Sequence, residues 1–476
     1  MSNGLNEECG VFGIYSNEQI DAAVYSYSAL FALQHRGQES CGIAVNDDGV
    51  ITNYSDIGLV GDVFKKDELR SLGKGSIAIG HCRYSPRENI SRANCQPLVI
   101  RHIKGPMTLA HNGSLTNGME LRESLENEGA IFQSTGEIEV LAHLITKERL
   151  TAPSIEVAVE RALTKVTGAY CLILMSAKKL IAARDPHGFR PLCMGKTETG
   201  YVFASESCAI DAIGAEHIRD IMPGEIVVVD ENGPRSITSR CGEKTSLCVF
   251  EYVYFARPDS IIDGSWVNEA RKRSGAFLAE SHPVDADVVI GVPDSGLDAA
   301  IGYSEQSGIP YGIGLIKNKY IGRTFTLPTK AAREASVRIK LNPVASVFKG
   351  KRVVLIDDSI VRGTTSKKIV KLIRDAGAKE VHMRISSPPF LYPCYFGTDV
   401  ADKAQLIACR LTVDEIAKEL GADSLGYLRI EDVERIAEGS NIGFCTGCFT
   451  GIYPIETPKE IVRSKFDQKI SESQKG

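Results

Sequence analysis

The sequence contains no apolar stretch that approaches the ~18 residues needed to span a bilayer. Its most apolar run, Tyr170–Met175, has only the length of a strand. Residues Met1–Glu8 lack the basic start and apolar middle of a secretory signal. Positive charge is not in excess either, because 55 Lys and Arg residues face 60 Asp and Glu residues, for a net charge of −5. A membrane span, a secretory signal and a general nucleic-acid surface are therefore not expected, while a local basic site for a small anion is still allowed.

The spacing of the cysteines shows no pattern of disulfide pairs. The 13 cysteines are odd in number and scattered from Cys9 to Cys448, which in the absence of a signal predicts a cytoplasmic protein with reduced thiols. With 43% hydrophobic and 24% charged residues, the chain has the balance of a globular protein and not of a disordered one. Its 476 residues suit about three domains or two large ones.

The two halves of the chain differ in their patterns of strand and helix signals. The first half mixes short strands, turns and helices, with helical spacing at 141–150 and 155–166 and a strand with an Asn-Gly turn at 224–233. From Asp287 on, short apolar runs alternate with helical segments, which is typical of a parallel α/β sheet. We therefore expect a domain at 9–240, a second at 241–458, and a polar tail at 459–476.

A candidate phosphate site lies in the second half. The apolar strand Val353–Asp357 is followed by Asp358 and by Arg-Gly-Thr-Thr-Ser at 362–366, and then by a helix that Gly377 closes. The helix N-terminus at 363–366 offers backbone N–H groups and the positive end of the helix dipole to a phosphate. Two adjacent aspartates can accept hydrogen bonds from sugar hydroxyls or face a divalent cation, although Asp-Asp alone also suits an ordinary solvated turn.

The whole pattern resembles the 5-phosphoribosyl 1-pyrophosphate (PRPP) motif of type I phosphoribosyltransferases. The resemblance implies that Asp357 and Asp358 bind the ribose and that Gly363, Thr364, Thr365 and Ser366 hold the 5-phosphate. A second strand and loop, at 287–296, would meet pyrophosphate and Mg²⁺, with Ser295 beside Asp357 and Asp358 at the metal. The cationic stretch 317–325, which begins at Lys317, suits a mobile lid over pyrophosphate, or equally a basic surface loop.

Four motifs accompany Cys9 in the first half. They are Gln34-His-Arg-Gly-Gln-Glu-Ser40, Gly80-His-Cys-Arg-Tyr-Ser85, Leu109-Ala-His-Asn-Gly-Ser-Leu115 and Arg184-Asp-Pro-His-Gly-Phe-Arg-Pro-Leu192. A lone cysteine is usually a small core residue, but in this order the motifs resemble those of class II glutamine amidotransferases, a branch of the N-terminal-nucleophile hydrolases. The resemblance implies a four-layer αββα domain followed by a type I phosphoribosyltransferase domain with a parallel sheet.

The same resemblance assigns roles in a glutamine site. Cys9 is the nucleophile, exposed by removal of a propeptide at 1–8, and its α-amino group then has a pKa of about 7.7–8.0 that suits a base. Asn112 and Gly113 stabilise the oxyanion. The expected glutamine-binding residues are Arg36, Gly37, Arg83 and Glu137. Glu137 stands where the family usually has an aspartate, so its direct contact with the substrate amino group is an open point.

The pair Cys445 and Cys448 forms the only C-x-x-C motif, which by itself fits a redox, zinc or incidental pair. Cys248 and Cys394 join it only by resemblance, since their contexts are similar to those of the iron–sulfur PRPP amidotransferases. That subgroup holds a [4Fe-4S] cluster with four thiolates, whereas the spacing alone favours zinc equally. We expect the cluster to be structural.

The resemblance covers about 9–458 and implies an enzyme of the glutamine–PRPP amidotransferase family, which commits PRPP to purine synthesis. Glutamine and PRPP are the expected substrates, Mg²⁺ and a [4Fe-4S] cluster the cofactors, purine nucleotides the feedback inhibitors, and a homotetramer the assembly. Three alternatives are weaker. A hexosamine synthase would need sugar-isomerase repeats, a PRPP-sensing regulator would have no use for Cys9 and Asn112, and a degenerate amidotransferase paralogue is supported by Glu137 alone.

Overall fold

The computed structural model describes residues 9–84, 91–318, 320, 341–398, 400, 403–440 and 442–458. The predicted propeptide, the tail at 459–476 and most of the predicted lid therefore lie outside the described residues. The chain divides into two compact units. Of the described residues, the N-terminal unit contains those up to Ser246, Tyr395–Gly397 and 453–458. The C-terminal unit contains the described residues of Leu247–Cys394 and Thr398–Ile452. No helix in the described ranges is long and apolar enough to cross a membrane.

Two antiparallel sheets form the centre of the N-terminal unit. In the described residues, the first has the order β11 (Glu216–Asp220), β9 (Cys193–Lys196), β10 (Gly200–Ala204), β1 (Gly10–Ile20), β4 (Gly75–Arg83), β2 (Ser40–Asp47) and β3 (Val50–Ile57). The second has the order β13 (Gly233–Ile237), β12 (Ile226–Asp230), β8 (Leu180–Arg184), β7 (Cys171–Ser176), β6 (Gly105–Asn112) and β5 (Leu98–His102). The sheets face each other through an apolar layer that includes Val11, Ile79 and Ile173.

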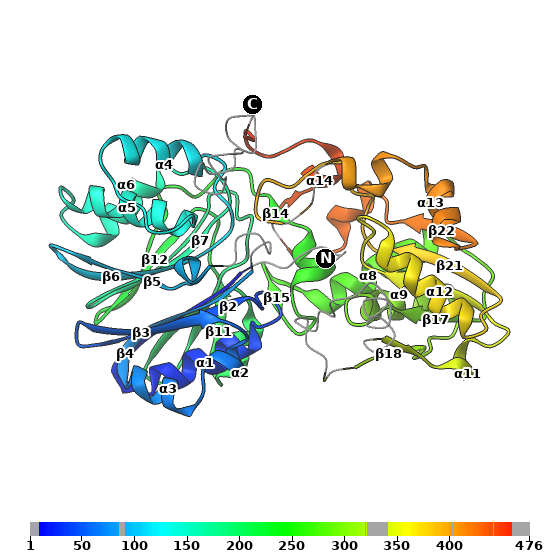
Figure 1. The fold of residues 1–476 in the computed structure, drawn as a ribbon, viewed down its shortest axis with the longest axis horizontal. Coiled ribbons are helices and arrows are strands. Elements are labelled where there is room, and N and C mark those ends of the chain that lie inside the picture. The colour runs from blue at the N-terminus through cyan, green and yellow to red at the C-terminus, as the bar shows by residue number, and fades with distance from the viewer. Residues whose placement is uncertain are drawn as a thin grey trace, which may run out of the picture. The chain divides into compact units, whose positions relative to one another are not determined.

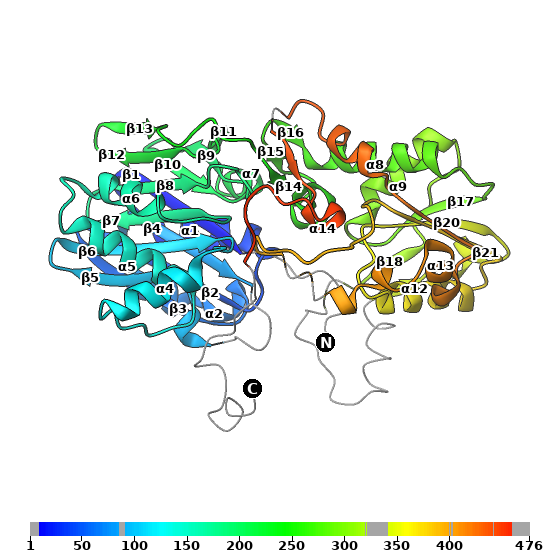
Figure 2. The same cartoon turned by 90° about the horizontal axis from the view of Figure 1, so that it is seen from above.

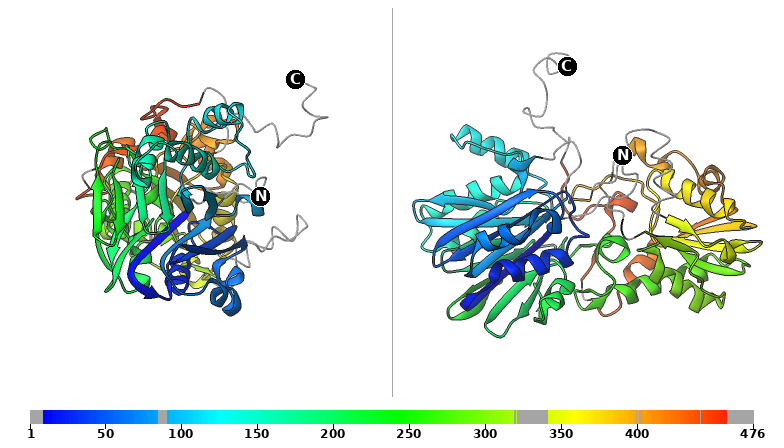
Figure 3. Two further views of the ribbon diagram at one scale, coloured as in Figure 1. Left: turned by 90° about the vertical axis from the view of Figure 1, so that its left-hand side faces the viewer. Right: turned by 60° about the horizontal axis from the view of Figure 1, so that its bottom comes forward.

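Helices cover the outer face of each sheet, as Figures 1 and 3 show. On the first sheet lie α1 (Ala22–Ala32), α2 (Val60–Val63), α3 (Lys66–Leu72) and α7 (Ser207–Ala212). On the second lie α4 (Gly118–Asn127), α5 (Glu137–Arg149) and α6 (Ile155–Leu163). This order of helix, sheet, sheet and helix confirms the predicted four-layer αββα domain. The glycine-rich start of β1 lets the sheets approach closely, since a Cβ on Gly13 would lie 2.9 Å from Ile173.

A parallel sheet forms the centre of the C-terminal unit. Its strands have the order β17 (Val288–Gly291), β20 (Arg352–Asp357), β21 (Glu380–Ile385) and β22 (Ser424–Tyr427). Figure 2 shows α8 (Val267–Ser281) and α9 (Gly296–Ser307) on one face, and α12 (Thr364–Asp375) and α13 (Val413–Leu420) on the other. Residues of β20 alternate between the two apolar layers, with Val354 in one and Leu355 in the other. The predicted parallel sheet is therefore confirmed, and helices cover both of its faces.

Shorter elements complete this unit. They are α11 (Ala345–Phe348), α14 (Gly447–Thr450) and the strand pairs β14 (Leu247–Cys248) with β23 (Phe444–Cys445), β15 (Ile261–Ile262) with β16 (Ser265–Trp266), and β18 (Leu315–Lys317) with β19 (Leu341–Pro343). The β14–β23 pair is parallel and joins the start of the unit to a segment near its end.

Most elements expected from the sequence are present. The helical spacing at 141–150 and 155–166 corresponds to α5 and α6, and the strand with its Asn-Gly turn corresponds to the β12–β13 hairpin. Helix α5 begins four residues earlier than its apolar pattern, at Glu137, because Glu137 and Glu139 in its first turn complement the helix dipole.

Candidate functional site

The strand that begins after Cys9 is held on both edges. Gly10 pairs with Cys82 of β4 on one side. On the other side, Val11 N–H donates to the Ser205 hydroxyl at 3.0 Å, and Ser205 N–H donates back to Val11 O at 3.0 Å. The Cys9 thiol lies 3.7 Å from the Tyr84 carbonyl oxygen. Cys9 is therefore a fixed, partly exposed thiol at the end of a buried strand.

The loop after α1 packs against this thiol. Arg36 Nε donates to Cys9 O at 3.3 Å, and the Arg36 side chain is fully buried. Gly37 approaches the end of β4 so closely that a Cβ would lie 2.7 Å from the Arg83 carbonyl carbon. The structure therefore brings together Cys9, Arg36, Gly37 and Arg83 at one end of the first sheet. Only glycine fits at position 37.

A buried carboxylate that was not predicted from the sequence holds this loop. Glu206 accepts hydrogen bonds from Arg36 Nη1 at 2.5 Å and from His35 Nε2 at 2.7 Å. Its side chain is fully buried, so the pairing satisfies both buried charges of Glu206 and Arg36. Glu206 lies 170 positions from Arg36, and no local pattern links the two residues.

The candidate oxyanion donors lie at the end of β6 in the second sheet. Val11 pairs with His81 in the first sheet, and His81 Nε2 donates to His111 O at 3.0 Å, one residue before Asn112. Among the residues that the structure describes, Asn112 Nδ2 is buried and has no hydrogen-bond partner. A buried donor is rarely left unpaired, so this amide is available to a ligand oxygen.

Gly113 adopts a conformation that few other residues tolerate. Its φ is +130°, and a Cβ would lie 2.2 Å from Ala169 O. The backbone therefore turns directly after Asn112, and the N–H of Gly113 stands next to the unpaired amide. The two predicted oxyanion donors are adjacent and both conformationally fixed.

Glu137 is the first residue of α5 and is largely buried beside the same turn. Its carboxylate accepts hydrogen bonds from Leu115 N–H at 3.0 Å and from the Ser114 hydroxyl at 3.3 Å. Burial raises the pKa of Glu137 to about 7, and the two hydrogen bonds oppose that rise. The Glu137 carboxylate thus reaches Ser114 and Leu115, directly after Gly113, and it titrates near neutral pH.

The resemblance implies that Glu137 binds the ammonium group of glutamine. On that prediction, Glu137→Gln is expected to raise the KM for glutamine by about 10- to 100-fold and to change kcat little, because a charged hydrogen bond would be lost. In the native protein the KM is expected to rise as the pH falls below about 7, where Glu137 becomes protonated and neutral. Steady-state glutaminase kinetics across this pH range measure both effects.

Glu139 is a matched control, because it lies two residues further along α5 and accepts hydrogen bonds from Gln133 and Ser134 N–H groups. Glu139→Gln is expected to lower the melting temperature and leave the KM unchanged. A native KM that is the same on both sides of pH 7 would contradict the role of Glu137.

The candidate phosphate turn lies at the start of α12. Gly363 has a φ of +78°, and its carbonyl accepts the Lys367 N–H at 2.9 Å. The N–H groups of Thr364, Thr365 and Ser366 therefore precede the helical hydrogen-bond ladder and are free to point at an anion. A Cβ on Gly363 would lie 2.7 Å from Ile407, so the turn requires glycine.

Two buried aspartates stand at the carboxyl end of β20, directly before this turn. Asp357 is 7% exposed and Asp358 is 9% exposed. Asp358 accepts hydrogen bonds from the Ser295 and Ser359 hydroxyls, and its own N–H donates to Asp357 at 3.1 Å. Burial raises the pKa of Asp357, and the neighbouring Asp358 raises it further.

Burial likewise raises the pKa of Asp358, although the hydrogen bonds from Ser295 and Ser359 act to lower it. Two crowded carboxylates with raised pKa values form an oxygen-rich set that a hard divalent cation or sugar hydroxyls would stabilise. Ser295 comes from the loop after β17, the neighbouring strand, as the sequence predicted. On the same loop Asp294 pairs with Lys317 at the end of β18.

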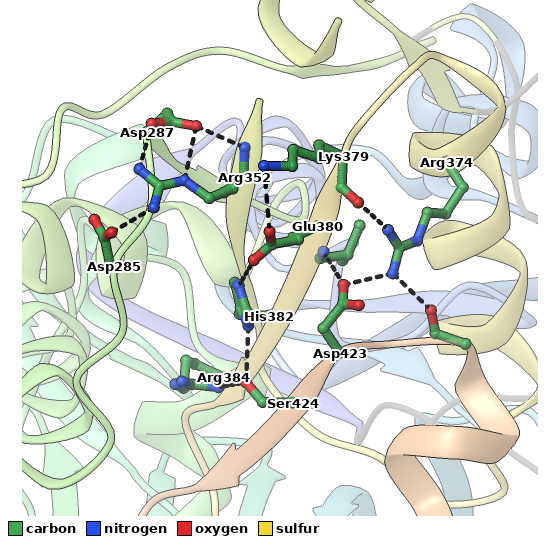
Figure 4. A network of polar contacts seen from close by, with 12 residues as sticks. Asp285, Asp287, Arg352, Arg374, Lys379, Glu380, His382, Arg384, Asp423 and Ser424 are labelled. Atoms are coloured by element: carbon green, nitrogen blue, oxygen red, sulfur yellow. Dashed lines mark hydrogen bonds and ion pairs between the residues drawn. The ribbon is translucent and has the colours of Figure 1, made fainter. Parts of the chain in front are cut away.

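Ion pairs at the opposite, amino-terminal edge of this sheet have a different character. Figure 4 shows Arg352 paired with Asp285 and Asp287, and Arg374 paired with Asp423. Asp287 and its partners are exposed, and the Arg352 guanidinium lowers the pKa of Asp287 to about 2. These charges neutralise each other across the strand starts, so we assign them a structural role.

The four cysteines of the candidate cluster are gathered in the C-terminal unit. Cys248 and Cys445 are register partners in the β14–β23 pair. Burial raises the pKa of Cys448, and Cys394, Cys248 and Cys445 raise it further, in that order. Leu391 and Tyr392 N–H groups donate to Cys448 O, both at 3.0 Å, and bring Cys394 to the same place. Within the described ranges, no group of three or more His, Cys, Asp or Glu side chains is positioned around a single metal ion.

Two family models match the chain. Residues 81–212 match a glutamine amidotransferase domain, and residues 269–386 match a phosphoribosyl transferase domain. The fold and the two sites thus define a glutamine amidotransferase joined to a phosphoribosyltransferase. Amidophosphoribosyltransferase from Methanocaldococcus jannaschii is 50% identical over 94% of this chain and 98% of its own length, and that from Bacillus subtilis is 47% identical over 96% of both chains. The chain belongs to the amidophosphoribosyltransferase family.

Solved structures agree with this family. The B. subtilis glutamine PRPP amidotransferase complexed with ADP and GMP has a TM-score of 0.89 and 46% identity, covering 95% of this chain and 99% of that one. A structure of the allosteric regulatory enzyme of purine biosynthesis also has a TM-score of 0.89, with 45% identity over 97% and 99% of the two chains.

Proposed function

We propose that the chain converts glutamine, PRPP and water to 5-phosphoribosylamine, glutamate and pyrophosphate, the first committed step of purine synthesis. The observation that carries the proposal is the unpaired, buried Asn112 amide beside the turn at Gly113, in a chain that also holds the Asp357–Asp358 pair and its phosphate turn. One chain then contains a centre for opening a carboxamide and a centre for a phosphorylated sugar.

In the N-terminal unit, the Cys9 thiol gives its proton to the Cys9 α-amino group, and the resulting thiolate attacks the glutamine carboxamide. The oxyanion that forms is stabilised by Asn112 Nδ2 and Gly113 N–H. As the oxyanion collapses, the α-ammonium group of Cys9 returns its proton to the leaving nitrogen, which departs as ammonia and leaves a thioester at Cys9. Water then hydrolyses the thioester to glutamate and the free thiol. Arg83 holds the α-carboxylate of the substrate and Glu137 its ammonium group.

In the C-terminal unit, ammonia attacks C1 of PRPP and displaces pyrophosphate. The N–H groups and hydroxyls of Thr364, Thr365 and Ser366 bind the 5-phosphate, while Asp357 and Asp358 orient the ribose. Lys317 reaches the pyrophosphate side of the site, where its partner in the structure is Asp294. The carboxylate pair and Ser295 suit Mg²⁺, which would offset the charge on the departing pyrophosphate.

Pyrophosphate release driven by ammonium chloride in place of glutamine tests the transferase half. We expect Mg²⁺-dependent release from PRPP without any glutamine. A glutaminase that releases no pyrophosphate under either nitrogen source would overturn the proposal and favour the PRPP-sensing regulator or a degenerate paralogue.

Exposure of the Cys9 α-amino group requires removal of 1–8. Members of the family that carry such a propeptide cleave it themselves, and we propose the same for this chain. Mass spectrometry of the active protein is expected to show Cys9 as the first residue. Full activity in protein that retains Met1 would contradict the assignment of the base.

We propose that Cys248, Cys394, Cys445 and Cys448 hold a structural [4Fe-4S] cluster. Support comes from the gathering of the Cys248, Cys394 and Cys445 thiols around Cys448. The cluster would then fasten β23 to β14 at the two ends of the unit.

Cys445→Ser is expected to remove the visible absorption of the anaerobically purified protein and to lower its melting temperature. Cys409→Ser is the matched control, since Cys409 lies in the same unit, is also partly exposed, and donates to Leu391 O at 3.2 Å. Stoichiometric zinc in metal analysis, with no iron or sulfide, would contradict the cluster.

The B. subtilis relative was solved with ADP and GMP, and we infer from it that purine nucleotides regulate this chain. We also propose a cytoplasmic homotetramer, by analogy with the family. Inhibition by GMP or ADP of pyrophosphate release, and light scattering of the purified protein, test these two points.

A further inference from the structure

The motif Arg184–Leu192 has no part in the chemistry proposed above, yet it is among the most buried segments of the N-terminal unit. The Asp185 carboxylate accepts hydrogen bonds from the N–H groups of His187 at 3.0 Å and Phe189 at 3.1 Å. The Arg184 guanidinium donates to Arg190 O at 2.7 Å and to Gly188 O at 3.1 Å. These bonds fix the loop from both sides, so Phe189 and Arg190 stand on a rigid base.

On one side this loop adjoins the turn that carries the oxyanion donors. Asn112 pairs with Cys171, which in turn pairs with Arg184. Asp185 also accepts the Tyr170 N–H, directly after Ala169, whose N–H donates to Ser114 O at 2.9 Å. The position of Gly113 is thus set by backbone contacts that lead back to the motif.

On the other side the loop holds a short segment from far along the chain, Tyr395–Gly397. Arg190 Nη2 donates to Phe396 O at 2.6 Å, and the Phe189 and Phe396 rings stack with centroids 4.3 Å apart. Phe396 is 2% exposed. Gly397, with a φ of +116°, lies against the oxyanion turn itself, since a Cβ there would be 3.0 Å from Arg190 Nη2 and 3.6 Å from Gly113 Cα.

The segment is unusual in its connections. Its three residues pack in the N-terminal unit, whereas the residues before and after it, Cys394 and Thr398, belong to the C-terminal unit. A change of conformation in the C-terminal unit would therefore pull directly on a piece of backbone that touches Gly113.

On the basis of the proposed function, we propose that Phe396 and Gly397, which Arg190 holds, are positioning residues for the oxyanion hole. Through them, glutamine hydrolysis depends on the state of the C-terminal unit. They touch neither glutamine nor PRPP. They act by holding the backbone of Gly113 so that its N–H and the Asn112 amide meet the developing oxyanion together.

The variants Phe396→Ala and Gly397→Ala test this. The first removes the ring stack, and the second forces a Cβ toward Arg190 at a strained φ. We expect each to lower kcat for glutamine hydrolysis by about 10- to 100-fold with little change in KM, as expected when an oxyanion donor is misplaced. Stimulation of glutamate release by Mg–PRPP is expected to be lost in both.

Two further measurements distinguish a positioning role of Phe396 and Gly397 from a role in the folding of the protein. Alkylation of Cys9 by iodoacetamide needs no oxyanion hole, and ammonia-driven pyrophosphate release bypasses the glutaminase, so both are expected to stay within about twofold of the native rates. Tyr395→Leu is the matched control, because Tyr395 is next to Phe396 but its ring packs edge-on against Tyr453, whereas Phe396 makes the stack on Phe189. This variant is expected to hydrolyse glutamine normally. Arg190→Lys, which keeps a donor for Phe396 O, is expected to retain more activity than Arg190→Met.

An unchanged kcat and unchanged PRPP stimulation in both variants would overturn the inference. An equal loss in all three readouts would also overturn it, since the segment would then serve folding alone. A native protein that does not hydrolyse glutamine would instead refute the proposed function, so the two failures are distinguishable.

Discussion

Cys9→Ala is expected to abolish glutamine-dependent pyrophosphate release, with a loss of at least about 10³-fold, because the proposed thioester forms on the Cys9 sulfur. Ammonia-driven release from PRPP is expected to persist, since it needs only the C-terminal unit. The measurement is pyrophosphate release by the same preparation with glutamine and then with ammonium chloride as the nitrogen source.

Cys241→Ala is the matched control for this substitution. Cys241 is partly exposed in the same unit as Cys9, and burial raises the pKa of its thiol, so it is a poor nucleophile. Its variant is expected to behave as the native protein. Glutamine-dependent activity that survives in Cys9→Ala would contradict the assignment of the nucleophile, and loss of both activities would mean that the substitution acts through the fold.

Asp357→Asn is expected to lower both glutamine- and ammonia-driven pyrophosphate release by about 10²-fold or more, because the buried carboxylate proposed to orient the ribose and bind the cation is replaced by a neutral amide. Asparagine keeps the shape and can still accept the Asp358 N–H that Asp357 accepts at 3.1 Å. Basal glutamate release without PRPP is expected to continue, since the N-terminal unit is unaltered.

The same substitution is expected to stabilise the ligand-free protein. The pKa of Asp357 is raised in the fold, so the folded protein loses stability as the pH rises from the ordinary pKa of a carboxyl to the raised one, and it carries the full penalty above that. Asparagine removes the penalty, and the melting temperature at alkaline pH is expected to rise by roughly 2 °C or more. Protection by Mg–PRPP against thermal unfolding is expected to disappear.

Asp287→Asn is the matched control, because Asp287 lies at the other end of the same sheet in the ion pairs of Figure 4. Its pKa is lowered to about 2, so its loss is expected to remove a favourable contact and leave pyrophosphate release intact. A melting temperature that falls in Asp357→Asn, or unchanged activity, would contradict the account of the carboxylate pair.

Local pattern was enough to predict the elements that carry the two candidate sites. The strand at 353–357 and the glycine before α12 are contiguous in sequence, so the phosphate turn follows from strand, glycine and helix signals alone. Cys9, Arg36 and Gly37 were identified through the resemblance of their motifs to those of class II glutamine amidotransferases. The roles assigned to these residues stay predictions.

Contacts between distant segments could not be predicted. Glu206 holds Arg36 across 170 positions, and Phe396 meets Arg190 across 206. Such contacts depend on how distant elements pack in the folded domain. The local sequence of Tyr395–Gly397 contains no pattern that predicts a segment packed in the other unit. The raised pKa of Glu137 has the same origin, because burial at the start of α5 is a property of the packed domain.

The central claim is that one chain takes nitrogen from glutamine and transfers it to PRPP. Its most direct test is the simultaneous measurement of glutamate and pyrophosphate from anaerobically purified protein, with and without Mg–PRPP. The account predicts that Mg–PRPP stimulates glutamate release by about tenfold or more and that the two products then form in equal amounts. Glutamate release that is indifferent to PRPP, with no pyrophosphate formed, would contradict it.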